Sequence, residues 1–182
     1  TVQAPFNTLE LGNSAATNPA DIVFVHTGNG TYNQTTTFTP LAANQKLIGD
    51  GAKYCLDTMC GPIDMQLTNI RPTISNGAAA SVNLGSASSG QTFDTANFIV
   101  SGSRIGVEAG IGLKTGSQAQ VINYEILSGG AGGFHTGLEF TDVTGATKGN
   151  PGYPGINVVN TSITDMNDVG IRVNGGAPTL AY

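Results

Sequence analysis

VINYEILSGGAGGFHTGLEF (Val121–Phe140) is the stretch of this chain that decides its fold. Apolar residues alternate with other residues on both sides of a glycine-rich turn, and a period of two is typical of a half-buried strand. In the second half, Leu138 and Phe140 point to one face and Glu139 points to the other. The stretch therefore predicts two short strands joined by a turn, and one such unit cannot bury its apolar face alone.

The same plan recurs on both sides of this stretch. NFIVSGSRIGVEAGIGL (97–113) precedes it, INVVNTSITDMNDVGIRV (156–173) follows it, and a weaker copy, RPTISNGAAASVNLGS, begins at Arg71. Successive copies can stack so that their inward residues form one continuous core, which is the principle of a solenoid. The second strands of the copies recur at intervals of 29, 27 and 33 residues, at Val82, Ile111, Leu138 and Ile171.

We therefore expect an all-β fold in which Leu113, Phe140 and Val173 stack in neighbouring coils of a β-solenoid, with their side chains inward. The composition agrees, because only 10% of the residues are charged and 26 are glycine. Strands and tight turns suit such a chain better than long helices do. A β-sandwich is the alternative, but it predicts tighter hairpins with a turn about every 8–12 residues.

Four short motifs near the N-terminus have a recognisable order. They are PFNTL (Pro5–Leu9), DIVFV (Asp21–Val25), GTY (Gly30–Tyr32) and LIGDG (Leu47–Gly51). In this order they resemble the cap, first strand, turn and closing segment of right-handed parallel β-helix proteins of the pectin-lyase-like superfold. Two segments, RPTI (Arg71–Ile74) and VNTSITDMNDVGIRV (159–173), look like repeat units of large bacterial surface and autotransporter-like proteins.

The resemblance spans nearly the whole chain and implies a right-handed parallel β-helix. We expect a single domain over 1–182, with an N-terminal cap region in 1–20 and about five or six irregular coils in 21–182. The cap itself is expected near Phe6 to Leu11, and the chain is expected to be a piece of a longer protein. His26, which follows the first strand, is expected to be structural or merely exposed.

Signatures of catalysis are weak in this chain. The lyases of the superfold use calcium-binding acids beside an arginine base, but no acid-rich strand accompanies Arg71, Arg104 or Arg172. Polygalacturonase and pectinesterase signatures do not occur either. The superfold hosts enzymes, adhesins and phage spikes alike. The sequence therefore leaves enzyme activity open and favours a non-catalytic stalk or adhesive, glycan-binding display surface. A polysaccharide-active lyase or glycoside hydrolase, or its inactive relative, is the alternative.

Four residues are candidate binding residues: His135, Tyr153, Asp165 and Asp168. Tyr153 lies in a segment with two prolines that should protrude as a loop, and loops on rigid scaffolds often carry binding sites. Asp165 and Asp168 lie in TDMNDVG, where the favoured role of such acids is hydrogen bonding within a turn. A calcium or ligand site and a catalytic acid pair are the alternatives. No cofactor is otherwise expected.

Cys55 and Cys60 are predicted to form a local disulfide, which points to an extracellular or cell-surface location. Two free thiols are the alternative. Seven scattered lysines and arginines and a net charge of −5 argue against nucleic acid, and no apolar run is long enough to cross a membrane. A glycan or a host or cell-surface protein is the expected partner. The uncharged ending NGGAPTLAY also predicts end-to-end self-association.

Overall fold

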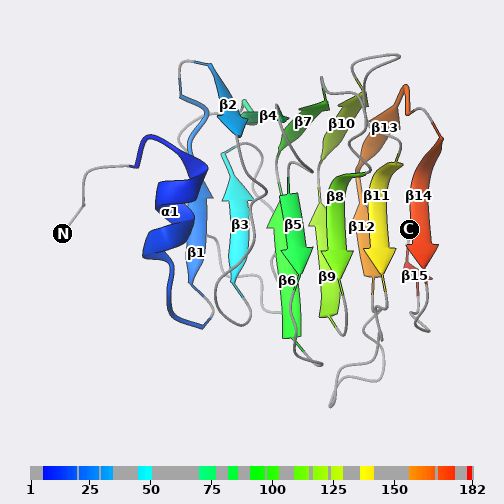
Figure 1. The fold of residues 1–182 in the computed structure, drawn as a ribbon, viewed down its shortest axis with the longest axis horizontal. Coiled ribbons are helices and arrows are strands. Elements are labelled where there is room, and N and C mark those ends of the chain that lie inside the picture. Colours follow the sequence, from blue (N-terminus) through cyan, green and yellow to red (C-terminus); the bar gives the residue numbers. More distant parts are fainter. Residues whose placement is uncertain are drawn as a thin grey trace.

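The described part of the chain is largely β, with one short helix and strands arranged in parallel sheets (Figure 1). A computed structural model describes residues 6–19, 21–28, 30–34, 45–50, 70–76, 82–85, 91–96, 98–102, 109–114, 117–122, 124–128, 136–141, 156–166, 168–174 and 180–181. The elements are α1 (Leu9–Ala15), β1 (Ile22–Val25), β2 (Thr31–Gln34), β3 (Lys46–Gly49), β4 (Thr73–Asn76), β5 (Val82–Gly85), β6 (Gln91–Ala96), β7 (Ile99–Gly102), β8 (Ala109–Lys114), β9 (Ser117–Ile122), β10 (Glu125–Ser128), β11 (Thr136–Thr141), β12 (Ile156–Val159), β13 (Ser162–Thr164), β14 (Val169–Asn174) and β15 (Leu180–Ala181).

The strands form three sheets, which we name A, B and C. Sheet A has the order β1-β3-β6-β9-β12-β15, sheet B the order β2-β4-β7-β10-β13, and sheet C the order β5-β8-β11-β14. All of the strand pairs seen between described strands are parallel. From β6 to β14 the chain visits A, B and C in the same order three times. Neighbours within a sheet are thus separated in sequence by strands of the other two sheets.

The register of sheet C confirms the repeat predicted from the sequence. In β11, Leu138 and Phe140 are buried and Glu139 between them is partly exposed, so the period of two holds in this strand. Phe140 is opposite Leu113 on one side and Val173 on the other. The four residues at which the second strands recur are also register partners from strand to strand: Val82, Ile111, Leu138 and Ile171.

The last strand of sheet C departs from the expectation that its apolar residues are covered. Ile171 is 44% exposed and Val173 is 39% exposed, whereas their partners Leu138 and Phe140 are 0% and 1% exposed. The reason is position, because among the described strands β14 is at the end of its sheet and pairs on one side, with β11. The side chain of Leu113 lies outside the described part of the structure.

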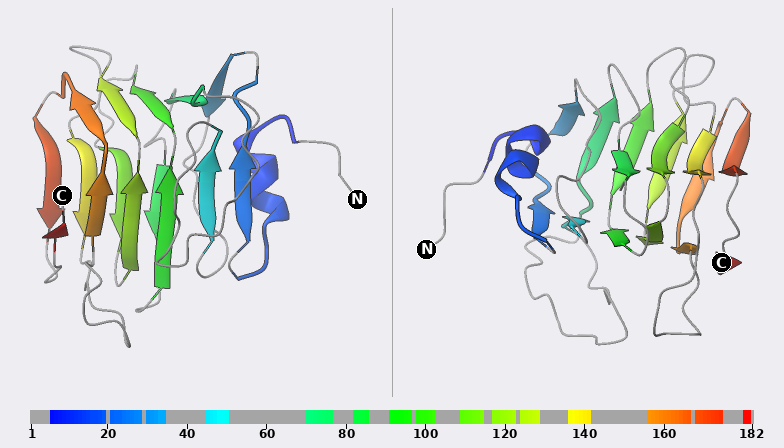
Figure 2. Two further views of the ribbon diagram at one scale, coloured as in Figure 1. Left: turned by 180° about the vertical axis from the view of Figure 1, so that it is seen from behind. Right: turned by 60° about the horizontal axis from the view of Figure 1, so that its bottom comes forward.

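Buried residues from all three sheets form one hydrophobic cluster. Figure 2 shows the three sheets from two further directions. β-Branched and leucine side chains dominate the cluster. Of the buried aromatic rings, Phe98 and Tyr124 come shortly after β6 and β9 of sheet A, and Phe140 lies in β11 of sheet C. Phe98 and Tyr124 contact each other with ring centroids 5.6 Å apart. The buried members are Leu9, Ala16, Val23, Val25, Leu47, Ile74, Phe98, Val100, Val121, Tyr124, Ile126, Leu138 and Phe140.

Helix α1 packs beside β1 at one end of this core (Figure 1). Its N-cap is Thr8, whose Oγ1 accepts a hydrogen bond of 3.2 Å from the backbone N–H of Leu11. Leu9 and Ala16 are buried in the core, and the side-chain amide of Gln45 donates a hydrogen bond to the carbonyl of Ala16. The helix is therefore fastened to the first strands of the chain at both of its ends.

The buried hydroxyl pair of Tyr124 and Thr95 leads to a prediction about alkaline stability. The two hydroxyls are hydrogen-bonded, and burial raises the pKa of Tyr124 well above its ordinary value near 10. In the unfolded chain this phenol ionises from about pH 10, so stability should fall as the pH rises further, by up to about 1.4 kcal/mol per pH unit. Tyr124→Phe should remove this contribution, which urea midpoints measured between about pH 8 and about pH 11 would reveal.

Thr95→Val is the matched control for Tyr124→Phe. It removes the same hydrogen bond but keeps the buried phenol, so it should lower stability at neutral pH by about 1 kcal/mol and retain the alkaline loss. Identical pH profiles for Tyr124→Phe and the unmodified chain would contradict the assignment of this loss to Tyr124.

Candidate functional site

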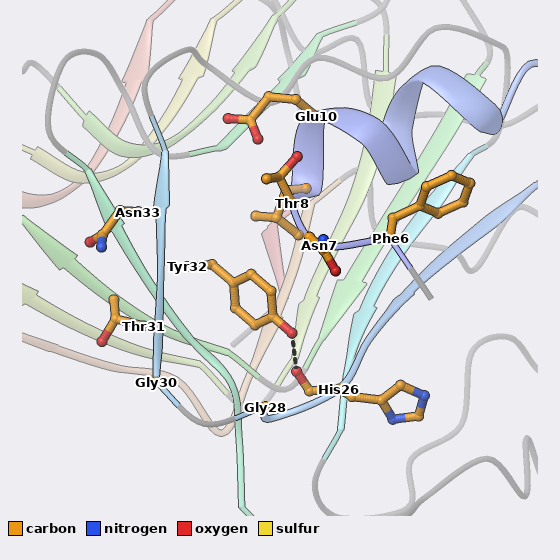
Figure 3. Close-up of a pocket in the computed structure, with 11 residues that line it drawn as sticks. Phe6, Asn7, Thr8, Glu10, His26, Gly28, Gly30, Thr31, Tyr32 and Asn33 are labelled. Atoms are coloured by element: carbon orange, nitrogen blue, oxygen red, sulfur yellow. Dashed lines mark hydrogen bonds between the residues drawn. The ribbon is translucent and has the colours of Figure 1, made fainter. Parts of the chain in front are cut away.

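A cavity of about 440 Å³ opens between the segment that leads into α1 and the connection from β1 to β2 (Figure 3). The α1 side contributes Phe6 and Glu10, and the β1–β2 side contributes Thr31, Tyr32 and Asn33. These two segments are joined through the core, because Leu9 and the β1 valines belong to the same hydrophobic cluster. The cavity therefore has walls that the fold holds in place.

Tyr32 forms one wall of the cavity, and its hydroxyl donates a 2.7 Å hydrogen bond to the backbone carbonyl of His26. Burial raises the pKa of this phenol, so it stays protonated and remains a donor at neutral pH. Gly28, with a φ of 60°, makes the turn beneath it, and a Cβ there would lie 3.3 Å from the Tyr32 hydroxyl oxygen. The turn therefore favours glycine for both its backbone angle and its closeness to the ring.

The other lining groups combine apolar surface with hydrogen-bonding groups. Phe6 is half exposed, while Glu10 is partly buried and its Oε1 is shielded from solvent without a hydrogen-bond partner. Small-molecule sites have this character, with apolar walls and a few polar groups that fix orientation. A ligand hydroxyl is the chemically matching donor for the Glu10 oxygen. A sugar offers such hydroxyls together with a face of C–H groups that can contact an aromatic ring.

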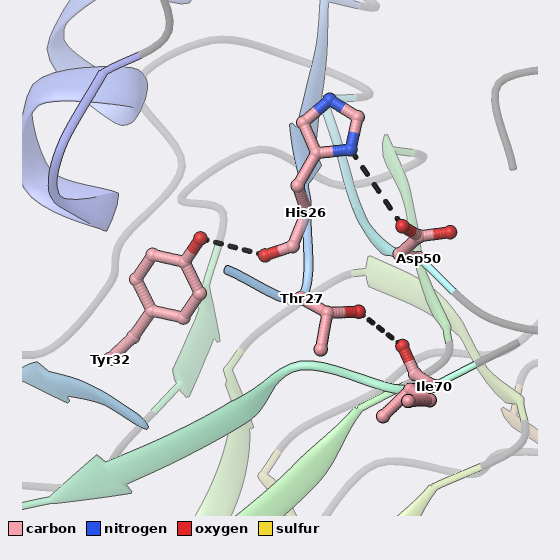
Figure 4. A network of polar contacts seen from close by, with 5 residues as sticks. All are labelled: His26, Thr27, Tyr32, Asp50 and Ile70. Carbon is pink, nitrogen blue, oxygen red and sulfur yellow. Dashed lines mark hydrogen bonds and ion pairs between the residues drawn. The ribbon is translucent and has the colours of Figure 1, made fainter. Parts of the chain in front are cut away.

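His26 and Asp50 form a second polar feature where β1 and β3 end (Figure 4). The register that pairs Val25 with Gly49 brings the next two residues together, and His26 Nδ1 lies 3.8 Å from Asp50 Oδ2. Asp50 is buried, while the imidazole is partly exposed. The imidazole also makes an edge-to-face contact with the ring of Phe24, with the ring centroids 4.9 Å apart. The arrangement forms an ion pair when His26 is protonated.

The imidazole of His26 points away from the cavity. Figure 3 shows the ring directed away from Tyr32, so that His26 contributes to the cavity through its backbone. The neighbouring Thr27 donates a hydrogen bond from Oγ1 to the carbonyl of Ile70, which ties the end of β1 to the segment before β4 (Figure 4). His26 thus lies where the first strand ends, and its ring is held by local contacts.

The structure describes only two of the four binding residues predicted from the sequence. Asp165 and Asp168 are exposed between β13 and β14, at the opposite end of the sheets from α1 (Figure 1). Asp165 has a φ of 58°, which suits a turn, and Asp168 is ion-paired with Arg172. Neither acid lies near the cavity. The remaining two, His135 and Tyr153, and the proposed cysteine pair, Cys55 and Cys60, lie outside the described residues.

Phe6, Glu10 and Tyr32 are candidate residues that sequence reasoning did not identify as a site. The motifs PFNTL and GTY contain Phe6 and Tyr32, but as sequence motifs they indicate a cap and a turn of the fold. Within the described ranges, no cluster of three or more His, Cys, Asp or Glu side chains could hold a metal ion. No helix in the same ranges is both long and apolar enough to span a membrane.

Comparison of this chain with protein-family models, with curated proteins and with solved structures found no match. The resemblance to pectin-lyase-like β-helices therefore stays a prediction based on the quoted motifs.

Proposed function

We propose that this chain is a non-catalytic β-solenoid segment of a surface or secreted protein, and that it binds a short glycan in the cavity between α1 and β2. In this proposal the three sheets are the faces of a right-handed parallel β-helix of about five or six coils, and α1 is its N-terminal cap. The repeated visiting order A, B, C and the matched registers support it.

A scaffold role is supported by the way the sheets divide their residues. Each strand of sheet B places one residue in a row that belongs to the core or packs against it: Tyr32, Ile74, Val100, Ile126 and Ile163. Within each strand, the residues on either side of the row point to the opposite face of the sheet. They recur from strand to strand at a regular spacing of about 4.8 Å. Such a framework can present side chains in fixed positions along its length, as a stalk or adhesive surface requires.

Glycan binding is supported by one observation above all: the cavity combines Phe6 and Tyr32 with a shielded, unsatisfied carboxylate oxygen of Glu10. Aromatic rings and a carboxylate acceptor match the apolar face and the hydroxyl groups of a sugar. A net charge of −5 makes a neutral glycan a better ligand than a uronate. An extracellular or cell-surface location and the Cys55–Cys60 disulfide are part of the same proposal.

Binding of neutral oligosaccharides should depend on Phe6 and Glu10. We expect a glycan array to identify a ligand, and we expect Phe6→Ala and Glu10→Gln each to weaken it about tenfold in titration calorimetry, since each removes a contact of about 1–1.5 kcal/mol. Leu11→Ala is the matched control, because Leu11 is equally exposed on α1 but does not line the cavity. Absence of any glycan ligand, or binding that neither variant changes, would refute the proposal.

The His26–Asp50 pair favours a second candidate, a polysaccharide-active enzyme. A buried carboxylate 3.8 Å from a partly exposed imidazole is an arrangement that general acid–base chemistry could use. Incubation with neutral and uronate polysaccharides, with and without Ca²⁺, and measurement of new chain ends would test it. Turnover that His26→Ala abolishes would replace the non-catalytic proposal with this one.

A further inference from the structure

The cavity between α1 and β2 carries negative charge without positive charge among its described lining residues. Glu10 is acidic, and the described lining contains no lysine or arginine. His26 contributes its backbone there, while its ring points away (Figure 3). The other lining residues are apolar, hydroxyl-bearing or amide-bearing, or glycine. A ligand in this cavity therefore meets a carboxylate and no described cationic side chain.

The carboxylate of Glu10 lacks the kind of partner that other acids of the described chain have. Arg71 pairs with Glu125 at 3.0 Å, and Arg172 pairs with Asp168. With the described residues Glu10 forms no such ion pair, and its Oε1 is shielded from solvent without accepting a hydrogen bond. Removal of a charged oxygen from water costs free energy unless a donor or an opposite charge replaces the water. The site therefore favours a ligand group that supplies both.

The position of Glu10 in the first turn of α1 does not supply this partner. Acidic residues are favourable there, because the first backbone N–H groups of a helix have no partner within the helix. One of these groups, the N–H of Leu11, is already bonded to Thr8 Oγ1. No hydrogen bond from the described groups reaches Glu10 Oε1. The helix explains why an acid is tolerated at this position, but it leaves the shielded oxygen to another donor.

A hydroxyl group and an ammonium group offer different things to this carboxylate. A hydroxyl donates a hydrogen bond and leaves the charge uncompensated, whereas an ammonium donates several hydrogen bonds and carries the opposite charge. Hydrogen bonds between charged groups are roughly twice as strong as those between neutral groups. The net charge of −5 also attracts a cation to the chain. An ammonium group is the better match for Glu10.

The aromatic rings of the cavity are separate from this carboxylate, so the ligand must extend beyond the ammonium group. Figure 3 shows the carboxylate of Glu10 directed away from the ring of Phe6. The hydroxyl of Tyr32 is bonded to the carbonyl of His26, which leaves the ring as its contact surface. A cavity of about 440 Å³ is within the size range of sites that hold small molecules. An amino sugar can reach both kinds of group, because it combines an ammonium with a face of C–H groups.

We infer that the glycan bound in this cavity contains an amino sugar with a free amino group, whose ammonium form pairs with Glu10. The inference rests on the glycan binding proposed above and names the class of sugar. Acetylation of the nitrogen removes the charge but leaves a hydrogen-bond donor. N-acetylated sugars and sugars with a hydroxyl at the same carbon should therefore bind more weakly, and uronates should bind most weakly.

Pairs of sugars that differ at one carbon test the inference. In titration calorimetry at about pH 6, where a primary amine is protonated, oligosaccharides of glucosamine and of galactosamine are compared with those of glucose and of galactose. We expect at least one amino form to bind about tenfold more tightly than its hydroxyl counterpart. Glu10→Gln should remove this preference, since it keeps the shape of the side chain and removes its charge.

Glu139→Gln is the matched control for Glu10→Gln. It makes the same substitution and removes the same charge, but Glu139 faces outward from β11 and does not line the cavity. It should leave the preference for the amino sugar unchanged. A preference that both variants reduce equally would come from net charge, and the inference would be wrong. Denaturant midpoints of both variants establish that each is folded.

Failure of this inference is distinguishable from failure of the proposed function. Equal affinities for the amino and hydroxyl forms, or a preference that Glu10→Gln leaves intact, would overturn the inference while glycan binding stands. Binding of none of these sugars would also overturn it, whatever other ligand a glycan array identifies. Only the absence of every glycan ligand would refute the proposed function together with the inference.

Discussion

Leu138→Asp is expected to lower the free energy of unfolding by at least about 4 kcal/mol, whereas Ile171→Asp should lower it by only about 1–2 kcal/mol. The two residues are register partners in adjacent strands and occupy the same column. Leu138 is completely buried, so a carboxylate there has no access to water. Ile171 is partly exposed, and its replacement would reach solvent.

Urea unfolding followed by circular dichroism measures both losses. Glu139→Ala is the control for the strand itself: Glu139 faces outward and accepts a 2.7 Å hydrogen bond from Asn174. Its removal should cost no more than about 0.5 kcal/mol. Equal losses for the two aspartate variants would contradict the difference in burial between β11 and β14.

The repeat and its register could be predicted from the sequence because both depend on local patterns. Each copy carries an apolar residue at every second position, and a shift of one residue would turn all of them outward. Alignment of the copies on Gly-apolar-x-apolar therefore gave the partners Ile111, Leu138 and Ile171 that the sheet contains. The β-rich character followed from the same pattern and from the composition.

The exposure of β14 could not be predicted in the same way. Alternation shows which face of a strand is apolar, but it does not show whether another strand lies beyond it. Helix α1 was also missed, because seven residues make only about two turns and give no clear helical periodicity. The available signal was Thr8, a favourable N-cap residue followed by Leu-Glu-Leu.

The cavity could not be predicted because it forms where separate segments converge. Phe6 and Glu10 come from one segment, and Tyr32 comes from another that reaches the same place through the packing of α1 on β1. The contact between His26 and Asp50 could be predicted from the sequence, since each residue directly follows an apolar strand and the two strands pair in parallel. Reasoning from acidic turns led instead to Asp165 and Asp168, which lie at the other end.

Gly137→Ala is expected to lower the free energy of unfolding by about 2–4 kcal/mol, although it adds a single methyl group. A Cβ at Gly137 would lie 2.5 Å from Ile163 Cγ2 and 2.8 Å from the carbonyl oxygen of Gly170. The first contact is with a side chain of β13, and the second is with the backbone of the neighbouring strand β14. Relief of both requires the pairing of β11 with β14 to shift.

Gly170→Ala is the matched control, because the nearest atom to its Cβ, Ile163 Cγ2, is 3.8 Å away, which is ordinary van der Waals contact. It should change stability by no more than about 0.5 kcal/mol in thermal or urea unfolding. Ile163→Ala combined with Gly137→Ala should recover only part of the loss, since the carbonyl of Gly170 stays in place. Full recovery would mean that the side chain of Ile163 alone excludes the methyl group. Equal losses for the two glycine variants would contradict the difference in space around them, namely that Ile163 of β13 lies closer to Gly137 in β11 than to Gly170 in β14.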